Sequence, residues 1–183
     1  MRAFPLWLVA GLAIGAATLG LRAQTKPLDW KLYGLTKISS DQMELFYERS
    51  QIKHVQTGYV LVWTMKLSAK EIEAARRAMG KDLIDRVERK VAANYVPPYG
   101  RIKELSRDEM IAVTSSEEIA NDAEIQSHAR ILYELDCSGR MFRERSFYTA
   151  SDGTTRTLDS TSRWQPLAQQ TDAVSLTTLL CPP

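Results

Sequence analysis

The chain has 183 residues, of which 44% are hydrophobic and 25% are charged, and its formal net charge is +2. This is the composition of an ordinary folded soluble protein, and the length provides one domain with an accessory element rather than two separate cores. A charge balance this close to neutral excludes the strong global field that draws in nucleic acid or anionic lipid. We therefore expect no nucleic-acid partner.

The first residues follow a pattern that differs from the rest of the chain. Arg2 is followed by an apolar run over residues 4–17 that is rich in glycine and alanine, and then by polar sequence. A single positive charge, a short apolar stretch and small residues near its end are typical of a secretory signal peptide. We predict a signal peptide over residues 1–23, and we expect membrane contact only through this transient segment.

Two positions are candidates for cleavage. Cleavage after Ala23 places Leu21 where a small residue is preferred, whereas cleavage after Gly20 has small residues at both key positions. The alternative is an uncleaved anchor, because residues 4–21 approach the length of a bilayer span. The glycine- and alanine-rich end favours cleavage over a stable anchor.

Export would place the protein in oxidising surroundings, where cysteines form disulfides. The chain has two cysteines, Cys137 and Cys181, so one intramolecular pairing is available. We predict that they are joined and that the bond attaches the C-terminus to a strand ending at Cys137. Closing a loop of roughly 45 residues would contribute about 4 kcal/mol in the chain-entropy model.

The first part of the mature chain is predicted to form strands. Residues 28–34, 41–48 and 57–67 are three runs in which apolar residues tend to alternate with others, as they do in half-buried strands. In the first run, Trp30 and Leu32 point inward. The third run is the strongest, and one face of it carries Tyr59, Leu61, Trp63, Met65 and Leu67.

A helical insertion is predicted over residues 68–125. Ser68 and Glu71 have the spacing of a capping box, and apolar residues then recur at intervals of three and four to about Asn94. Gly80 in the middle of this helix is expected to mark a kink. The apolar stripe of the helix comprises Ile72, Ala75, Met79, Leu83, Val87 and Val91.

The strand pattern resumes over residues 127–137, turns at Ser138-Gly139 and returns over residues 140–150. In the first of these strands, alternate residues predict a buried face of Ala129, Ile131, Tyr133, Leu135 and Cys137. A final helix follows Thr171-Asp172, and the residues expected to share one side of it are Val174, Thr177, Thr178 and Cys181. The fold class is α+β: a small antiparallel sheet with a helical insertion and a C-terminal helix tethered by a disulfide.

Short motifs in a fixed order give the chain a family resemblance. They are Trp30, Phe46-Tyr47-Glu48-Arg49-Ser50-Gln51-Ile52, Val60-Leu61-Val62-Trp63, Asp136-Cys137, Trp164 and Cys181. With these motifs the chain resembles the surface-adhesin protein E family of Gram-negative bacteria. The resemblance implies a single protein E-like domain over residues 28–183 and an envelope or surface location. In the best-known member it implies binding to host matrix proteins.

The chain also departs from the family pattern. The helical block at residues 68–125 is longer than the family's loop, and Gln169-Gln170-Thr171-Asp172 stands where a Pro-Gly-Ser turn is usual. Because one fold hosts many functions, the resemblance implies the fold more strongly than it implies adhesion.

The sequence does not predict an enzyme. Its two histidines, His54 and His128, have no cysteine or glutamate at ligand spacing, so we expect neither a metal nor a catalytic role for them. Ser50-Gln51-Ile52-Lys53 matches a motif of penicillin-binding enzymes whose companion motifs are missing, and we take the match as chance. We expect no catalytic residues, no cofactor and no metal.

One stretch is a candidate binding surface, in which arginines interleave with aromatic residues. Arginine beside exposed aromatic rings can hold a glycan, a nucleic acid or an acidic protein surface. The simpler interpretation is a strand of mixed faces whose charge is neutralised by nearby acidic residues, because three arginines make a weak patch. The residues of the candidate surface are Arg140, Phe142, Arg143, Arg145 and Tyr148.

These patterns together favour an exported binding protein located in the periplasm or on the outer-membrane surface of a Gram-negative bacterium. By resemblance it is adhesin-like, with a host matrix protein as its partner. The alternative is a periplasmic accessory protein that binds another envelope component through the helical insertion, if the apolar stripe of that insertion is not covered by the sheet.

Overall fold

The computed structural model describes residues 28–56, 58–94, 105–122, 128–149, 155–157, 162–169 and 171–181. The predicted signal peptide over residues 1–23 lies outside these residues. The strands are β1 (Trp30–Ile38), β2 (Asp41–Glu48), β3 (Lys53–Gln56), β4 (Tyr59–Ser68), β5 (Arg130–Asp136), β6 (Met141–Tyr148), β7 (Thr155–Thr157) and β8 (Gln165–Pro166). The helices are α1 (Ala69–Asn94), α2 (Arg107–Ala120) and α3 (Thr171–Leu180), with short 3-10 turns η1 (Arg49–Gln51) and η3 (Leu167–Gln169).

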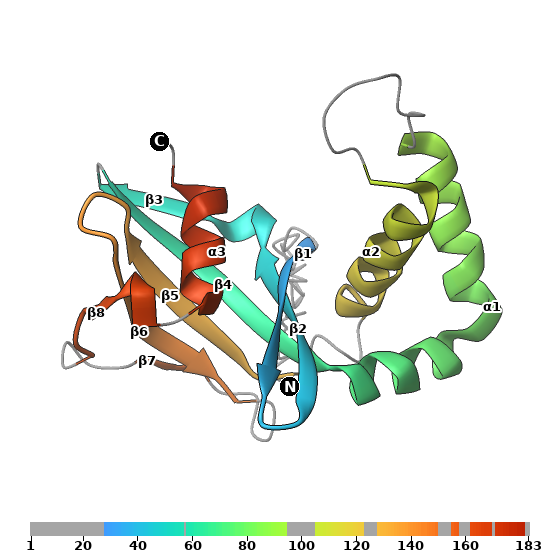
Figure 1. Ribbon diagram of the computed structural model, residues 1–183, viewed down its shortest axis with the longest axis horizontal. Coiled ribbons are helices and arrows are strands. Elements are labelled where there is room, and N and C mark those ends of the chain that lie inside the picture. The colour runs from blue at the N-terminus through green and yellow to red at the C-terminus, as the bar shows by residue number, and fades with distance from the viewer. Residues whose placement is uncertain are drawn as a thin grey trace, which may run out of the picture.

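The described strands form one antiparallel sheet, which confirms the predicted α+β class. The order along the sheet is β1-β2-β4-β5-β6-β7, while β3 pairs with β4 and β8 pairs with β6. In Figure 1, α3 crosses one face of the sheet, and α1 and α2 lie beside β1 and β2. Among the described residues, none of the helices combines the length and the apolar character that crossing a bilayer requires.

Both faces of the sheet are packed, and β4 contributes to each. Val60 and Val62 are buried in a cluster with Ala173 and Leu176 of α3, whereas Leu67 is buried in a second cluster with residues of α1 and α2. Successive residues of a strand point to opposite faces, so one strand supplies both clusters. We call these two sides of the sheet the α3 face and the α1–α2 face.

The predicted helical insertion is confirmed and consists of α1 and α2. The Ser68 N–H and hydroxyl each donate to Glu71 Oε2 at 2.6 Å, which caps the start of α1 as the sequence predicts. The backbone at Gly80 has φ 49° and ψ −127°, so α1 kinks there and its second half folds back along α2. Residues of the predicted apolar stripe are buried against the sheet and α2, namely Ile72, Leu83, Val87 and Val91.

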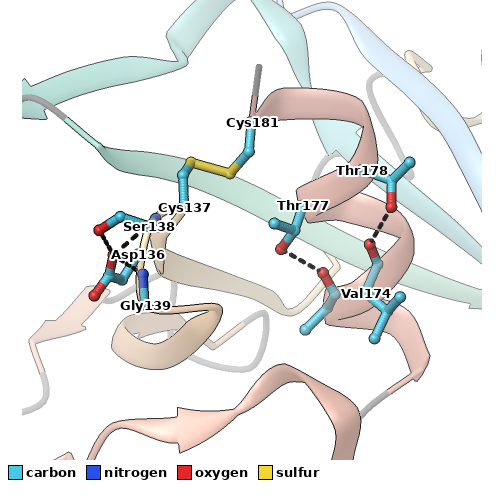
Figure 2. Close-up of a disulfide and its surroundings, with 9 residues drawn as sticks. Asp136, Cys137, Ser138, Gly139, Val174, Thr177, Thr178 and Cys181 are labelled. Atoms are coloured by element: carbon cyan, nitrogen blue, oxygen red, sulfur yellow. Dashed lines mark hydrogen bonds between the residues drawn. A yellow bond between two sulfur atoms is a disulfide. The ribbon is translucent and has the colours of Figure 1, made fainter. Parts of the chain in front are cut away.

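The C-terminal helix is fixed to the sheet at both of its ends. At its start, the Asp172 carboxylate lies 2.6 Å from Lys66 Nζ of β4. At its end, Cys181 is joined to Cys137, as predicted, with a Cα–Cα distance of 5.4 Å. Figure 2 shows this bond beside the turn that follows β5, where the Asp136 carboxylate accepts two hydrogen bonds from Ser138 and one from Gly139.

The side of α3 that faces the sheet differs from the prediction. Ala173 and Leu176 are buried, whereas Thr178, which was expected on the inner side, is exposed. Thr177 and Thr178 each donate a side-chain hydrogen bond to the backbone carbonyl four residues earlier in the helix, as Figure 2 shows. Their hydroxyls are therefore satisfied within α3, and the apolar Ala173 and Leu176 pack on the sheet.

Candidate binding surface

One part of the α1–α2 face bears arginine and aromatic side chains in place of a helix contact. Alternate residues of β4 and β5 bring Leu61, Glu134 and Arg143 into one row across three strands. None of these residues belongs to the cluster that α1 and α2 cover among the described residues. This end of the face therefore presents polar and aromatic groups that are only partly buried.

Arg143 lines a cleft of about 270 Å³ in this region, which we call the Arg143 cleft. Its guanidinium carbon lies 4.4 Å from the centre of the Trp164 ring, and its Nε lies 2.6 Å from Glu134 Oε2. The ring of Tyr59 packs against Trp164 with centroids 5.9 Å apart. The residues lining the cleft are Val55, Tyr59, Glu134, Arg143 and Trp164.

This geometry pre-organises the arginine. The stacked ring and the carboxylate hold the guanidinium in place, so less side-chain entropy remains to be lost when a partner binds. Arg145 adds a second guanidinium 3.5 Å from the same Glu134 oxygen. Two arginines share this one carboxylate, so the three groups together carry a net charge of +1.

A smaller cavity of about 150 Å³ lies on the same face, which we call the Arg130 cavity. Arg130 extends over the Tyr148 ring at 4.6 Å and the Trp30 ring at 5.9 Å. Burial lowers the pKa of Arg130, and electrostatic interactions with Tyr148 and Glu48 only partly oppose this effect. The guanidinium remains protonated in any case. The lining residues are Leu28, Trp30, Glu48, Gln51, Trp63, Arg130 and Tyr148.

Glu48 is the buried acidic group of this cavity, with a relative exposure of 1%. Its Oε1 accepts from the Asp29 N–H at 2.7 Å and from the Ser50 hydroxyl at 2.6 Å. This ties the residues just before β1 to the end of β2. Its Oε2 and the Trp30 indole N–H have no hydrogen-bond partner among the described residues, so the cavity wall has one acceptor and one donor to offer.

The predicted surface residues lie in three different places. Arg143, Arg145 and Tyr148 lie on the partly exposed α1–α2 face described above. Phe142 does not lie on it: only 1% of it is exposed, and it packs edge-on against Tyr133 on the α3 face. Neighbouring residues of β6 point to opposite faces, and this alternation separates Phe142 from Arg143. Arg140 lies in the exposed turn before β6.

Sequence reasoning missed the partners of these arginines. Trp164 is distant from Arg143 in the sequence, and Glu134 lies outside the buried face that alternation predicts for its strand. A signal was present, because Tyr59 and Trp63 share one face of β4 and Arg130 and Glu134 share one face of β5. The pairing of β4 with β5 places these aromatic and charged side chains on one surface, and this pairing was not predicted from the sequence.

The histidines lie elsewhere. His128 Nε2 is 3.3 Å from Glu71 Oε1, and His54 is exposed on β3. Burial raises the pKa of Glu71, but hydrogen bonds from Ser68 and the contact with His128 outweigh it and lower the pKa overall. Among the described residues, no group of three or more histidine, cysteine, aspartate or glutamate side chains is arranged to hold a metal ion.

The fold and this surface define a disulfide-bonded α+β protein with a partly exposed arginine–aromatic sheet face. Comparison with models of protein families, with curated proteins and with solved structures finds no match. The similarity to the surface-adhesin protein E family thus remains a prediction from the sequence motifs.

Proposed function

We propose that the protein is an exported, non-catalytic binding module that holds a protein partner on the surface around Arg143. The observation that carries this proposal is the arrangement of Arg143 between Trp164 and Glu134, with Tyr59 beside the ring. Arginine, tryptophan and tyrosine are the residue types that dominate the binding energy of protein interfaces. Arg143 and the neighbouring Arg145 together outweigh Glu134 by one positive charge, which suits an acidic protein surface.

Two features support export. The N-terminal residues 1–23 have the pattern of a signal peptide, and the Cys137–Cys181 bond is of a kind that persists in oxidising compartments. The resemblance to the protein E family adds the envelope of a Gram-negative bacterium as the location. It also adds a host matrix protein as the partner, so the module is adhesin-like.

The alternative is a periplasmic accessory role for the helical insertion, and the structure offers it less support. The apolar stripe that would dock a partner is occupied by the sheet and α2 through Leu83, Val87 and Val91. Ile84 is the large apolar side chain of α1 that stays exposed, at 56%. We therefore place the partner on the sheet face.

Site-specific photo-crosslinking in the native cells separates these two possibilities. A photoreactive amino acid replaces Val55, which is 51% exposed at the rim of the Arg143 cleft, or Ile84, which is similarly exposed on α1. We expect a discrete crosslinked band from position 55 that disappears with Trp164→Ala, and none from position 84. Crosslinking from position 84 alone would favour the accessory role.

Protease added to whole cells then tests the location. Digestion of the protein in intact cells would support a surface adhesin, whereas digestion only after the outer membrane is opened would place the module in the periplasm. Intact mass before and after reduction with alkylation tests export. Loss of about 20 to 23 N-terminal residues is expected, and a full-length mass would contradict cleavage.

A further inference from the structure

A second binding site is visible at the free edge of the sheet. Among the described strands, β1 ends the order and pairs only with β2. An edge strand presents a row of backbone N–H and C=O groups that can pair with another strand. At Trp30 these groups are already bound by a side-chain amide: Asn121 Oδ1 accepts from the Trp30 N–H at 2.9 Å, and Asn121 Nδ2 donates to the Trp30 carbonyl at 3.1 Å.

Beyond Trp30 the same edge forms the floor of a groove of about 600 Å³, which we call the β1 groove. Five consecutive residues of β1, from Lys31 to Leu35, line it. A bulge at Tyr33 interrupts the pairing of β1 with β2 between Leu32 and Gly34, and side chains on either side of it alternate between the two faces. Tyr47 of β2 and Arg49 also line the groove. Because its remaining lining comes from helices on both faces of the sheet, the groove follows the edge of β1 rather than one face. The groove is thus placed where an added strand would run.

The walls of the β1 groove come from two helices on opposite sides of the sheet. Residues near and within α2 supply Leu105, Val113 and Glu117, and α3 supplies Ser175, Thr178 and Leu179. Figure 1 shows β1 passing between α2 and α3. Three of the large apolar side chains that are exposed to solvent meet here: Leu35 at 60%, Leu105 at 45% and Leu179 at 52%.

Charge and size indicate the chemistry of the occupant. Each cationic side chain that lines the groove is already paired, Lys31 with Glu117 at 2.7 Å and Arg49 with Asp29 at 2.6 Å. An occupant therefore needs no charge of its own. A stable dimer contact takes about 20 to 30 residues on each side, and the groove is much smaller than that.

We propose that the β1 groove binds one extended, uncharged peptide segment of a partner protein as an additional strand beside β1. Main-chain hydrogen bonds to β1 would provide affinity, in the manner that the Asn121 amide already uses at Trp30. Alternate side chains of the bound peptide would face α2 and α3. Leu105 and Val113 make the α2 wall mainly apolar, whereas the α3 wall has Leu179 beside the hydroxyls of Ser175 and Thr178. The peptide should therefore present apolar residues to α2 and apolar or hydroxyl-bearing residues to α3.

The probe is a fluorescein-labelled peptide of valine, isoleucine and threonine, about nine residues long to match β1, with lysines at its ends for solubility. Two further versions carry N-methyl groups on one or the other set of alternate residues, so each blocks one edge of the peptide. Fluorescence anisotropy with the full disulfide-bonded protein measures binding. We expect the parent peptide and one N-methylated version to bind and the other N-methylated version not to bind, because the peptide would pair with β1 through only one of its two edges.

Matched surface variants locate the site. Leu179→Lys places a charge on the α3 wall and should weaken binding about tenfold or more. Ile84→Lys makes the same change at a similarly exposed residue of α1 and should leave the affinity unchanged within about twofold. Circular dichroism confirms that both variants are folded.

Three results would overturn the proposal. They are equal binding by the two N-methylated peptides, no binding of the parent peptide, and equal affinity of the wild-type protein and Leu179→Lys. A dimer in solution that Leu179→Lys dissociates would show that a second copy occupies the groove, which also contradicts the proposal. The crosslinking experiment at Val55 does not depend on these results, so the proposal for the Arg143 cleft is tested separately from the proposal for the β1 groove.

Discussion

Removal of the Cys137–Cys181 bond tests how the C-terminal helix is attached to the sheet. The bond joins the end of β5 to the residue after α3 across a sequence separation of 44. In the folded protein, Ala173 and Leu176 on the inner side of α3 are also buried against the sheet. We therefore expect the protein with Cys137→Ala and Cys181→Ala to keep α3 docked while its free energy of unfolding falls.

The magnitude follows from loop closure in the unfolded chain. A separation of 44 corresponds to a stabilisation of about 4 kcal/mol at 25 °C in the chain-entropy model, before any cost of replacing the sulfurs. For a chain of this length, each kcal/mol shifts the melting temperature by roughly 2–4 °C. The double variant should thus melt roughly 8–16 °C below the oxidised wild type.

Urea unfolding followed by circular dichroism measures the change, with reduced wild-type protein as the second measurement. Hydrogen exchange at α3 amides, compared with amides of α1, reports whether α3 stays docked. A loss below about 1 kcal/mol would refute the loop-closure reasoning. Selective loss of protection in α3 would show instead that the bond, rather than packing, holds the helix on the sheet.

Three further predictions concern the insertion and the sheet. Gly80→Ala should destabilise the protein by about 1–2 kcal/mol, because φ is 49° there. In the control variant Gly34→Ala, the added Cβ meets its nearest atom at an ordinary 3.6 Å, so the loss of stability should be under about 1 kcal/mol. Equal losses for the two variants in urea unfolding would contradict this reasoning. Lys66→Met leaves the buried carboxylate of Asp172 without its partner at 2.6 Å. The free energy of unfolding should fall by about 1–2 kcal/mol after allowance for the partial exposure of Lys66. If adding Asp172→Asn restores the stability, the unpaired buried charge is the cause of the loss. The lowered pKa of Glu71 contributes stability that is complete above its unfolded pKa of about 4.3 and is lost as pH falls through the lower folded pKa. In Glu71→Gln, the free energy of unfolding measured with urea should therefore fall less steeply as the pH is lowered through this range. An unchanged pH dependence would contradict the assignment.

Local patterns in the sequence determined most of the architecture. Alternation predicted β2 at the observed residues, 41–48, and β5 with Tyr133 and Leu135 on its buried face. The change to a helical period after Ser68 predicted the insertion, and Gly80 predicted its kink. These features could be read in advance because side-chain periodicity, capping and glycine conformation act within a few residues. The cysteine pairing followed from there being two cysteines in a chain expected to be exported.

The tertiary structure decided what lies on each face of the sheet. The apolar pattern of β4 predicted one buried face, that of Met65 and Leu67. Val60 and Val62 on the opposite face are buried as well, because the C-terminal helix α3 packs over them. Phe142 and Arg143 are adjacent in sequence but lie on opposite sides, and Arg143 acquires Trp164 as its stacking partner only through the fold. Contacts between residues far apart depend on strand order and register, which are set by packing of the whole chain and which no local period encodes. The architecture was therefore predictable, whereas both proposed binding sites depend on the assembled structure.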